Sequence, residues 1–369
     1  MPRIRFAAAA SGRAPSVSGS AAWLVVWLIM LGTLGLAVLP WRWSSPRGVR
    51  IADGDKQRGV SYAHEWRHAE TLGYGTQASA DSLARLKSIG VTSIAITPFG
   101  FQSAPDDHAI RWGGNRFSET DDRLRQVASQ AHGLGIRVLL KPHIWLRPPA
   151  WVGLIEQRSE EGWSAWFAEY RAFILHYATL ASKAGMDGLC VGNELERTTG
   201  REREWRALIR DVRRSFKGPL TYGATVDEFR KVRFWDALDF IGISAYFPLV
   251  DAASPGRGAL VRAWAPIVRE MGEVSARWQK PIVFTELGYR SADFGAWKQW
   301  EVSGDAPVNL QLQADAYGAF FEAVWPQPWF GGVYWWKWWS FLENGGPEDN
   351  DYTPRDKPAE HVLESGFLR

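Results

Sequence analysis

The sequence lacks several features that would narrow its function at once. Cys190 is the only cysteine among 369 residues, so no disulfide can form within the chain and paired-cysteine metal motifs are excluded. Its position inside an apolar run predicts a buried, inert thiol. The formal net charge of +3 is too small to indicate a polyanionic partner, and nothing in the composition supports nucleic-acid binding.

Long uncharged runs are also scarce, and the exception lies near the amino terminus. Residues 21–39 contain no charged side chain, and at 1.5 Å per residue they would span roughly 28 Å, close to the hydrocarbon thickness of a bilayer. We therefore expect a basic tail at 1–20, a transmembrane signal anchor at 21–40 and a linker at 41–58. A cleaved signal peptide is the competing interpretation.

The topology of this expected span follows from its flanks. Arginines precede the span and no later span follows, which favours a single-pass protein whose catalytic domain lies outside the cytoplasmic membrane, although Arg42, Arg47 and Arg50 follow the span as well.

Tryptophan, by contrast, is abundant, with 22 residues in the chain. Large aromatic side chains fill protein cores, and their flat faces also pack against the C–H faces of sugar rings. Composition does not separate these two uses.

Residues 59–369 alternate between short apolar runs and longer amphipathic stretches, which is typical of repeated β-α units around a parallel sheet. A (β/α)8 TIM barrel needs about 250 residues, so we expect one such barrel here. The expected strands lie at 59–63, 91–97, 136–140, 188–191, 220–224, 240–245, 282–285 and 332–336. The expected helices lie at about 79–89, 120–135, 164–184, 202–216, 260–278, 310–325 and 358–363, with a short helix around Phe234.

Functional residues of barrel enzymes lie at the carboxyl ends of the strands. Glu194 and Glu286 end the fourth and seventh expected strands, and each emerges from an apolar run, where an unpaired carboxylate is costly. These strands stand across the barrel mouth, so the two carboxylates can face one another at about 5 Å, a separation typical of retaining glycosidases. A salt-bridged or capping role is the alternative for either residue alone.

The two glutamates lie in the segments Gly192-Asn193-Glu194 and Thr285-Glu286-Leu287-Gly288-Tyr289. These segments resemble the acid/base and nucleophile signatures of clan A glycoside hydrolases. More narrowly, the chain resembles glycoside hydrolase family 113, whose characterised members act on β-1,4-mannans. The resemblance covers roughly residues 59–362. It rests on these motifs: Gly192-Asn193-Glu194, Thr285-Glu286-Leu287-Gly288-Tyr289, Gly59-Val60-Ser61-Tyr62, Leu140-Lys141-Pro142-His143, Phe234-Trp235-Asp236, Asp239-Phe240-Ile241-Gly242, Ala245-Tyr246-Phe247-Pro248 and the Trp-Lys-Trp of 336–338.

The resemblance implies roles for these residues. Glu194 would be the acid/base and Glu286 the nucleophile. Asn193 would hydrogen-bond the 2-hydroxyl of the sugar in subsite −1, and Tyr246 would hold the nucleophile. His143 and Lys141 would contact substrate or the carboxylates, and Trp336 would form the floor of subsite −1. For these additional residues, a packed or satisfied core position is the alternative.

The sequence departs from the clan pattern at the second strand. Many clan members end that strand with an arginine that supports the nucleophile, whereas this chain has Thr97-Pro98-Phe99-Gly100 there. The supporting role is therefore unfilled or taken by a residue from elsewhere.

These roles predict a double displacement that needs no metal or organic cofactor. We expect the negative charge of Glu286 to raise the pKa of Glu194, and donors such as Tyr246 to keep Glu286 ionised. We also expect the two carboxyl groups to lie less than about 10 Å apart and neither to be buried against a permanent cation, and the opposite of either would count against the hydrolase interpretation.

Three alternatives remain. The substrate could be another β-glycan or a cell-envelope polysaccharide, with hydrolysis or transglycosylation. The barrel could bind carbohydrate without cleaving it, which two opposed carboxylates argue against. The acidic loop with Glu348, Asp349 and Asp351 could hold calcium, although a solvated loop is the default.

Overall fold

The computed structural model describes residues 49–113 and 119–369, all of which belong to one compact unit spanning residues 40–369. The expected tail and membrane span lie outside the described residues. Within the described ranges, no helix combines the length and apolar character needed to cross a bilayer.

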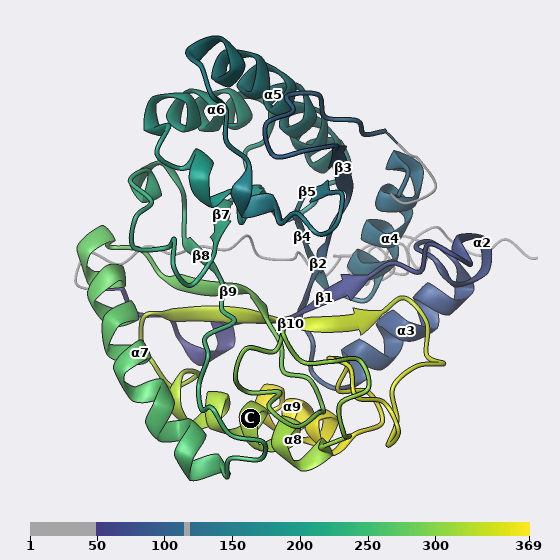
Figure 1. Cartoon of the computed structure of the whole chain (residues 1–369). Helices are drawn as coiled ribbons and strands as arrows, with labels where there is room; N and C mark the ends of the chain where they lie inside the picture. Colours follow the sequence, from purple (N-terminus) through teal and green to yellow (C-terminus); the bar gives the residue numbers. More distant parts are fainter. Residues whose placement is uncertain (1–48, 114–118) are drawn as a thin grey trace, which may run out of the picture. The chain divides into compact units, whose positions relative to one another are not determined.

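Eight parallel strands close into a barrel, as the alternating pattern predicts (Figure 1). Around the barrel each strand pairs with its neighbours in chain order, and the first strand pairs with the last. The strands are β1 (Gln57–Ala63), β2 (Ser93–Ile96), β4 (Arg137–Leu140), β6 (Gly188–Asn193), β7 (Leu220–Ala224), β8 (Ile241–Ser244), β9 (Ile282–Leu287) and β10 (Phe330–Trp339).

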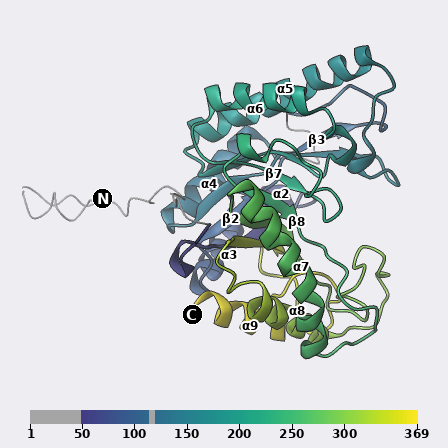
Figure 2. The same ribbon diagram turned by 90° about the vertical axis from the view of Figure 1, so that its left-hand side faces the viewer.

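Helices surround this barrel, and sequence neighbours such as α5 and α6, or α7 and α8, pack side by side (Figure 1 and Figure 2). They are α3 (Gln77–Ser88), α4 (Asp121–Gly133), α5 (Glu160–Lys183), α6 (Glu202–Ser215), α7 (Arg257–Trp278), α8 (Leu310–Ala323) and α9 (Pro358–Phe367). The crossover between β7 and β8 has only a single 3-10 turn at Trp235–Ala237.

Local signals explain where the helices begin. Thr76, Thr120 and Ser159 each accept a backbone N–H with the side-chain oxygen, and these N-caps start α3, α4 and α5. The inner faces of these helices then carry apolar side chains that pack on the strands, as Leu83 and Leu86 do in α3.

Two structural details differ from the expectation. An additional two-stranded parallel sheet, formed by β3 (Phe99–Gln102) and β5 (His143–Leu146), extends beyond the ends of β2 and β4. A short helix, α2 (Ala69–Leu72), also follows β1. These elements are four residues long each and follow the ends of β1, β2 and β4, so they belong to loops at the barrel mouth. Segments this short carry no strand–helix alternation that would predict them from the sequence.

A separate buried cluster fills the barrel and contains Ala95, Leu139, Phe240, Val283 and Tyr334. Side chains from opposite strands meet there, as in other barrels of this size, so the barrel is a solid core rather than a pore. Polar function is thereby confined to the ends of the strands.

Candidate active site

A cleft of about 680 Å³ opens at the carboxyl ends of the barrel strands. Its wall combines acidic, hydroxyl and aromatic side chains contributed by several strand ends and loops. They are Trp151, Glu194, Glu196, Thr225, Val226, Asp227, Ser244, Tyr246, Glu286, Trp300, Trp336 and Tyr352. Glu194 and Glu286 therefore share one cavity, as the sequence predicts.

Glu194 follows the last residue of β6 and adopts a left-handed backbone conformation, with φ of 55°. Its N–H donates to the carbonyl oxygen of Gly223 on β7 at 2.8 Å, and the Trp151 indole donates to its Oε2 at 3.3 Å. Burial raises the pKa of the Glu194 carboxyl, and the negative charge of Glu286 raises it further. The direction is the expected one, although burial contributes more than the neighbouring charge.

Glu286 lies on β9 with only 12% of its side chain exposed, and both carboxylate oxygens have donors. The Tyr246 hydroxyl donates to Oε2 at 3.0 Å, and the Lys141 ammonium contacts Oε1 in an ion pair. Burial and the nearby carboxylates hold the pKa of Tyr246 well above its usual value, so the phenol keeps the proton that it donates.

The expectation that neither carboxylate lies against a permanent cation is wrong, because Lys141 is fully buried beside Glu286. The physical reason is that a carboxylate which must stay ionised in a poorly solvated site needs a compensating charge. Lys141 follows β4, the third strand of the barrel. It therefore supplies the supporting cation for which the second strand offers no arginine.

Asn193 and His143 lie beside this pair but are not part of the cleft wall. Their side chains face each other, with 3.4 Å between Asn193 Nδ2 and His143 Nδ1, and the Ser244 hydroxyl lies 3.5 Å from Asn193 Oδ1. Burial lowers the pKa of His143 to about 4, so the imidazole is neutral near pH 7 and acts as a polar neighbour rather than a charge.

Four predicted residues, Glu194, Glu286, Tyr246 and Trp336, line the cleft directly, whereas Lys141, Asn193 and His143 support it from within the barrel. Sequence reasoning missed Trp151 and Trp300, which are 41% and 55% exposed in the same cleft. The high tryptophan content was the available signal for such exposed indoles, but it does not say which of them reach the cleft.

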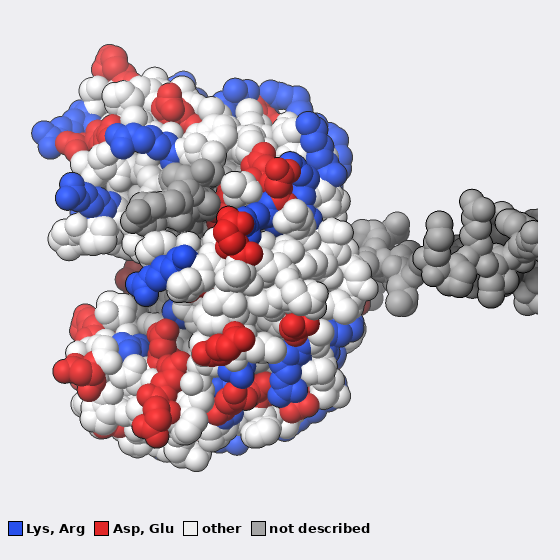
Figure 3. Space-filling view, turned by 90° about the vertical axis from the view of Figure 1, so that its right-hand side faces the viewer, with Lys and Arg blue, Asp and Glu red and all other residues white. Residues whose placement is uncertain are grey.

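The acidic character of the cleft wall is pronounced. Glu196 and Asp227 join the two central carboxylates, and none of the residues that line the cavity in the described part of the chain is lysine or arginine. On the face of the molecule drawn in Figure 3, by contrast, acidic and basic side chains are interspersed. Two of these carboxylates have cationic partners outside the cleft wall, because Lys141 pairs with Glu286, and Lys231 pairs with Glu196 at 3.2 Å.

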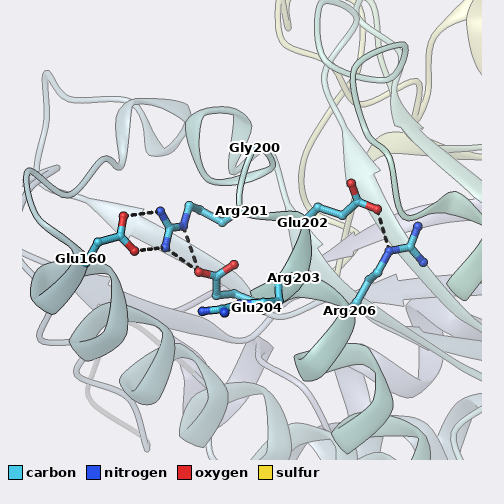
Figure 4. A pocket seen from close by; sticks show the side chains of 7 residues that line it. All are labelled: Glu160, Gly200, Arg201, Glu202, Arg203, Glu204 and Arg206. Atoms are coloured by element: carbon cyan, nitrogen blue, oxygen red, sulfur yellow. Dashed lines mark hydrogen bonds and ion pairs between the residues drawn. The ribbon is translucent and has the colours of Figure 1, made fainter.

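A second hollow of about 690 Å³ lies outside the barrel mouth, at the start of α6. Figure 4 shows Arg201 paired with Glu160 and Glu204, and Arg206 paired with Glu202, whereas Arg203 is drawn without a partner. Because most of these charges are compensated within the wall and no aromatic side chain lines it, this hollow is a salt-bridged surface depression.

The described ranges contain no group of three or more His, Cys, Asp or Glu side chains placed to hold a metal ion. In the acidic loop, Asp349 pairs with Lys357 at 3.3 Å and Asp351 with Lys337 at 2.9 Å, so lysines pair with two of the three carboxylates considered for calcium. Cys190 is buried, which raises the pKa of its thiol to about 11 and makes it a poor nucleophile, as expected.

Residues 64–68, His-Glu-Trp-Arg-His, carry the letter pattern of a zinc protease motif. In such a site a helix brings both histidines to one face. Here these residues precede α2 in irregular backbone, and the His64 Nδ1 accepts the N–H of Tyr74 at 3.3 Å. The pattern is therefore coincidental.

Comparisons with known proteins agree with this geometry. A family model of Glycoside Hydrolase Family 113 matches residues 62–357. A comparison with curated proteins found no match.

Among solved structures, the GH113 β-mannanase AaManA from Alicyclobacillus acidocaldarius, in complex with ManMIm, is 31% identical with a TM-score of 0.75. The alignment covers 85% of this chain and 97% of that chain. A second GH113 β-1,4-mannanase is 28% identical over 85% of this chain and 99% of the other, with a TM-score of 0.74.

A β-glucuronidase from Faecalibacterium prausnitzii shares only the fold. It is 14% identical, with a TM-score of 0.59 over 87% of this chain and 51% of that one. The family match, the barrel and the shared cleft of two glutamates lead to one conclusion: the chain belongs to glycoside hydrolase family 113, and it is a glycoside hydrolase rather than a non-catalytic binding barrel.

Proposed function

We propose that this enzyme hydrolyses a neutral β-linked glycan, β-1,4-mannan above all, with retention of anomeric configuration. The observation that carries the proposal is the different environment of the two glutamates in one cleft. Glu286 has an ammonium and a phenol on its oxygens, whereas Glu194 has a raised pKa and an indole N–H. One acid is set up to be ionised and the other to be protonated.

The proposed reaction has two steps. Glu286 attacks the anomeric carbon while Glu194 gives its proton to the departing glycosidic oxygen, which forms a glycosyl-enzyme ester. Glu194, now ionised, then takes a proton from water, and the water oxygen displaces Glu286 from the sugar. A separation of about 5 Å between the carboxyl groups is required for this mechanism.

The cleft wall supports a neutral substrate. A glucuronide carries a carboxylate, which would meet Asp227 and the ion-paired Glu196 in a wall without a lining lysine or arginine. Trp151, Trp300 and Trp336 offer aromatic faces suited to the C–H faces of neutral pyranose rings. The related solved enzymes are named β-mannanases, which favours mannan over other β-glycans.

Replacement of the two glutamates tests the mechanism. On the fragment from residue 51, Glu194→Ala should retain slow activity on aryl glycosides with good leaving groups and should be rescued by azide. Glu286→Ala should be inactive on all substrates, because no other group can form the ester. Full turnover by both alanine variants would contradict the assignment of the two residues.

The same fragment should release sugars from mannan faster than from β-glucan or an acidic glycan, measured by reducing-end assay on a polysaccharide panel. Preference for an acidic glycan would contradict the substrate proposal.

The buried cation gives a second prediction. Lys141→Met should lower kcat/KM by about 10²-fold or more, because it leaves the carboxylate of Glu286 without its charge partner. The matched control is Lys56→Met, which removes another buried lysine, paired with Asp53 at 2.7 Å. Lys56 lies just before β1, away from the cleft wall, so this variant should lose stability but not kcat/KM. Wild-type kcat/KM in a folded Lys141→Met enzyme would contradict the role of Lys141.

The Trp151 hydrogen bond predicts a pH effect. The first step needs protonated Glu194, so kcat/KM falls as pH rises through the pKa of this group. The Trp151 N–H favours the ionised carboxylate of Glu194. Trp151→Phe should therefore raise the pKa of Glu194 and shift the alkaline limb of the kcat/KM–pH profile to higher pH by about half a unit. Trp300→Phe, in the same cleft, should weaken binding and leave the limb in place. A downward shift in Trp151→Phe would refute this assignment.

We also propose that residues 21–40 anchor the enzyme in the cytoplasmic membrane with the barrel outside. The support is the run of uncharged residues between basic segments. Full-length protein expressed in bacteria should remain with membranes after a carbonate wash and be digested by protease added to spheroplasts. Recovery in the soluble fraction with residues 1–40 removed would indicate a cleaved signal peptide instead.

A further inference from the structure

A second buried acid lies directly behind the cleft. Glu228 follows β7 and is fully buried, yet it is absent from the cleft wall. Its Oε1 accepts the Tyr222 hydroxyl at 2.6 Å, and its Oε2 accepts the N–H of Thr225 at 3.0 Å. A buried carboxyl with two specific donors is costly to maintain, which points to a role beyond filling space.

The hydrogen bonds continue from Glu228 to the backbone of the proposed acid/base. Tyr222 lies on β7, where its ring packs against Trp205 and Phe234. Its hydroxyl oxygen accepts the N–H of Leu195 at 2.8 Å, and Leu195 directly follows Glu194. Glu228 thus orients the Tyr222 hydroxyl, and Tyr222 holds the peptide group between Glu194 and Leu195.

The peptide group on the other side of Glu194 is also tied to β7. The N–H of Glu194 donates to the carbonyl oxygen of Gly223, the residue next to Tyr222, at 2.8 Å. Both peptide groups that flank Glu194 are therefore held by consecutive residues of one strand.

Glu194 needs such support because of its backbone. A non-glycine residue with φ of 55° occupies a conformation that L-residues adopt rarely, and it persists only where surrounding contacts fix it. A β-region conformation at this position would direct the carboxyl group differently from its present place in the cleft that it shares with Glu286.

We propose that Tyr222 and Glu228 are positioning residues that hold Glu194 in its left-handed conformation, so that its carboxylic acid reaches the glycosidic oxygen. This inference rests on the proposed acid/base role of Glu194. Burial raises the pKa of Glu228 to about 8, and the hydrogen bonds from Tyr222 and Thr225 offset only part of this effect.

The test uses leaving groups that differ in their need for an acid. A dinitrophenolate departs without protonation, whereas phenol requires it. Tyr222→Phe should lower kcat/KM for phenyl β-mannobioside about 10-fold or more and change kcat/KM for 2,4-dinitrophenyl β-mannobioside less than about 2-fold. Glu228→Gln should act in the same direction, and it decides the question by the same criterion if Tyr222→Phe does not fold.

Tyr334→Phe is the matched control, because Tyr334 is also a buried strand tyrosine and donates to Gln57 Oε1 at 2.7 Å inside the barrel. It should show no selectivity between the two substrates. Equal losses on both substrates in Tyr222→Phe and Glu228→Gln, or no loss on either, would overturn the positioning role.

Glu194→Ala, measured in parallel, separates the two proposals. If Glu194→Ala is selective for the dinitrophenyl substrate but the Tyr222 and Glu228 variants are not, only the positioning role fails. If Glu194→Ala shows no selectivity, the acid/base role fails and the positioning role fails with it.

Discussion

The ion pair between Lys141 and Glu286 is the interaction on which the rest of the site depends. A buried ammonium and a nearly buried carboxylate are each costly alone, and each makes the other tolerable. The two residues come from β4 and β9, which are not neighbours in the sheet, so only a closed barrel brings them together. Closure of the barrel and the pairing of Glu286 with Lys141 are thus parts of one arrangement.

This pair also determines what the neighbouring acid can do. Burial disfavours a negative charge on Glu194, and the neighbouring carboxylate of Glu286 disfavours it further. Two chemically identical side chains therefore have different surroundings: an ammonium and a phenol contact Glu286, whereas burial and an indole N–H act on Glu194. This difference is the property that a double displacement requires.

The sequence was sufficient for the barrel and for the two central glutamates. Alternating apolar runs predicted the eight barrel strands, and strand-end placement selected Glu194 and Glu286, because both signals are local and periodic. The family resemblance implied that Lys141 contacts substrate or a carboxylate, but the periodic signals did not identify Glu286 as its ion-pair partner. Contact between the ends of β4 and β9 depends on the tilt of the strands and on the reach of the side chains across the barrel. Neither property can be derived from the spacing of residues along the sequence.

Loop residues were missed for a related reason. Trp151 and Trp300 lie in long connections whose path over the barrel mouth has no periodic signature. The bonds from Glu228 through Tyr222 to Leu195 were hidden as well, since residues 226–231 resemble an ordinary polar turn. Only the fold shows that this turn folds back beneath the end of β6.

Covalent trapping addresses the central claim, that Glu286 is the ionised nucleophile, most directly. The enzyme would be incubated with 2-deoxy-2-fluoro-β-mannosyl fluoride, digested, and its peptides analysed by mass spectrometry. A fluorosugar attached to Glu286 is the predicted result. Attachment to any other residue, or the absence of a covalent sugar in an enzyme that hydrolyses mannan with inversion, would contradict it.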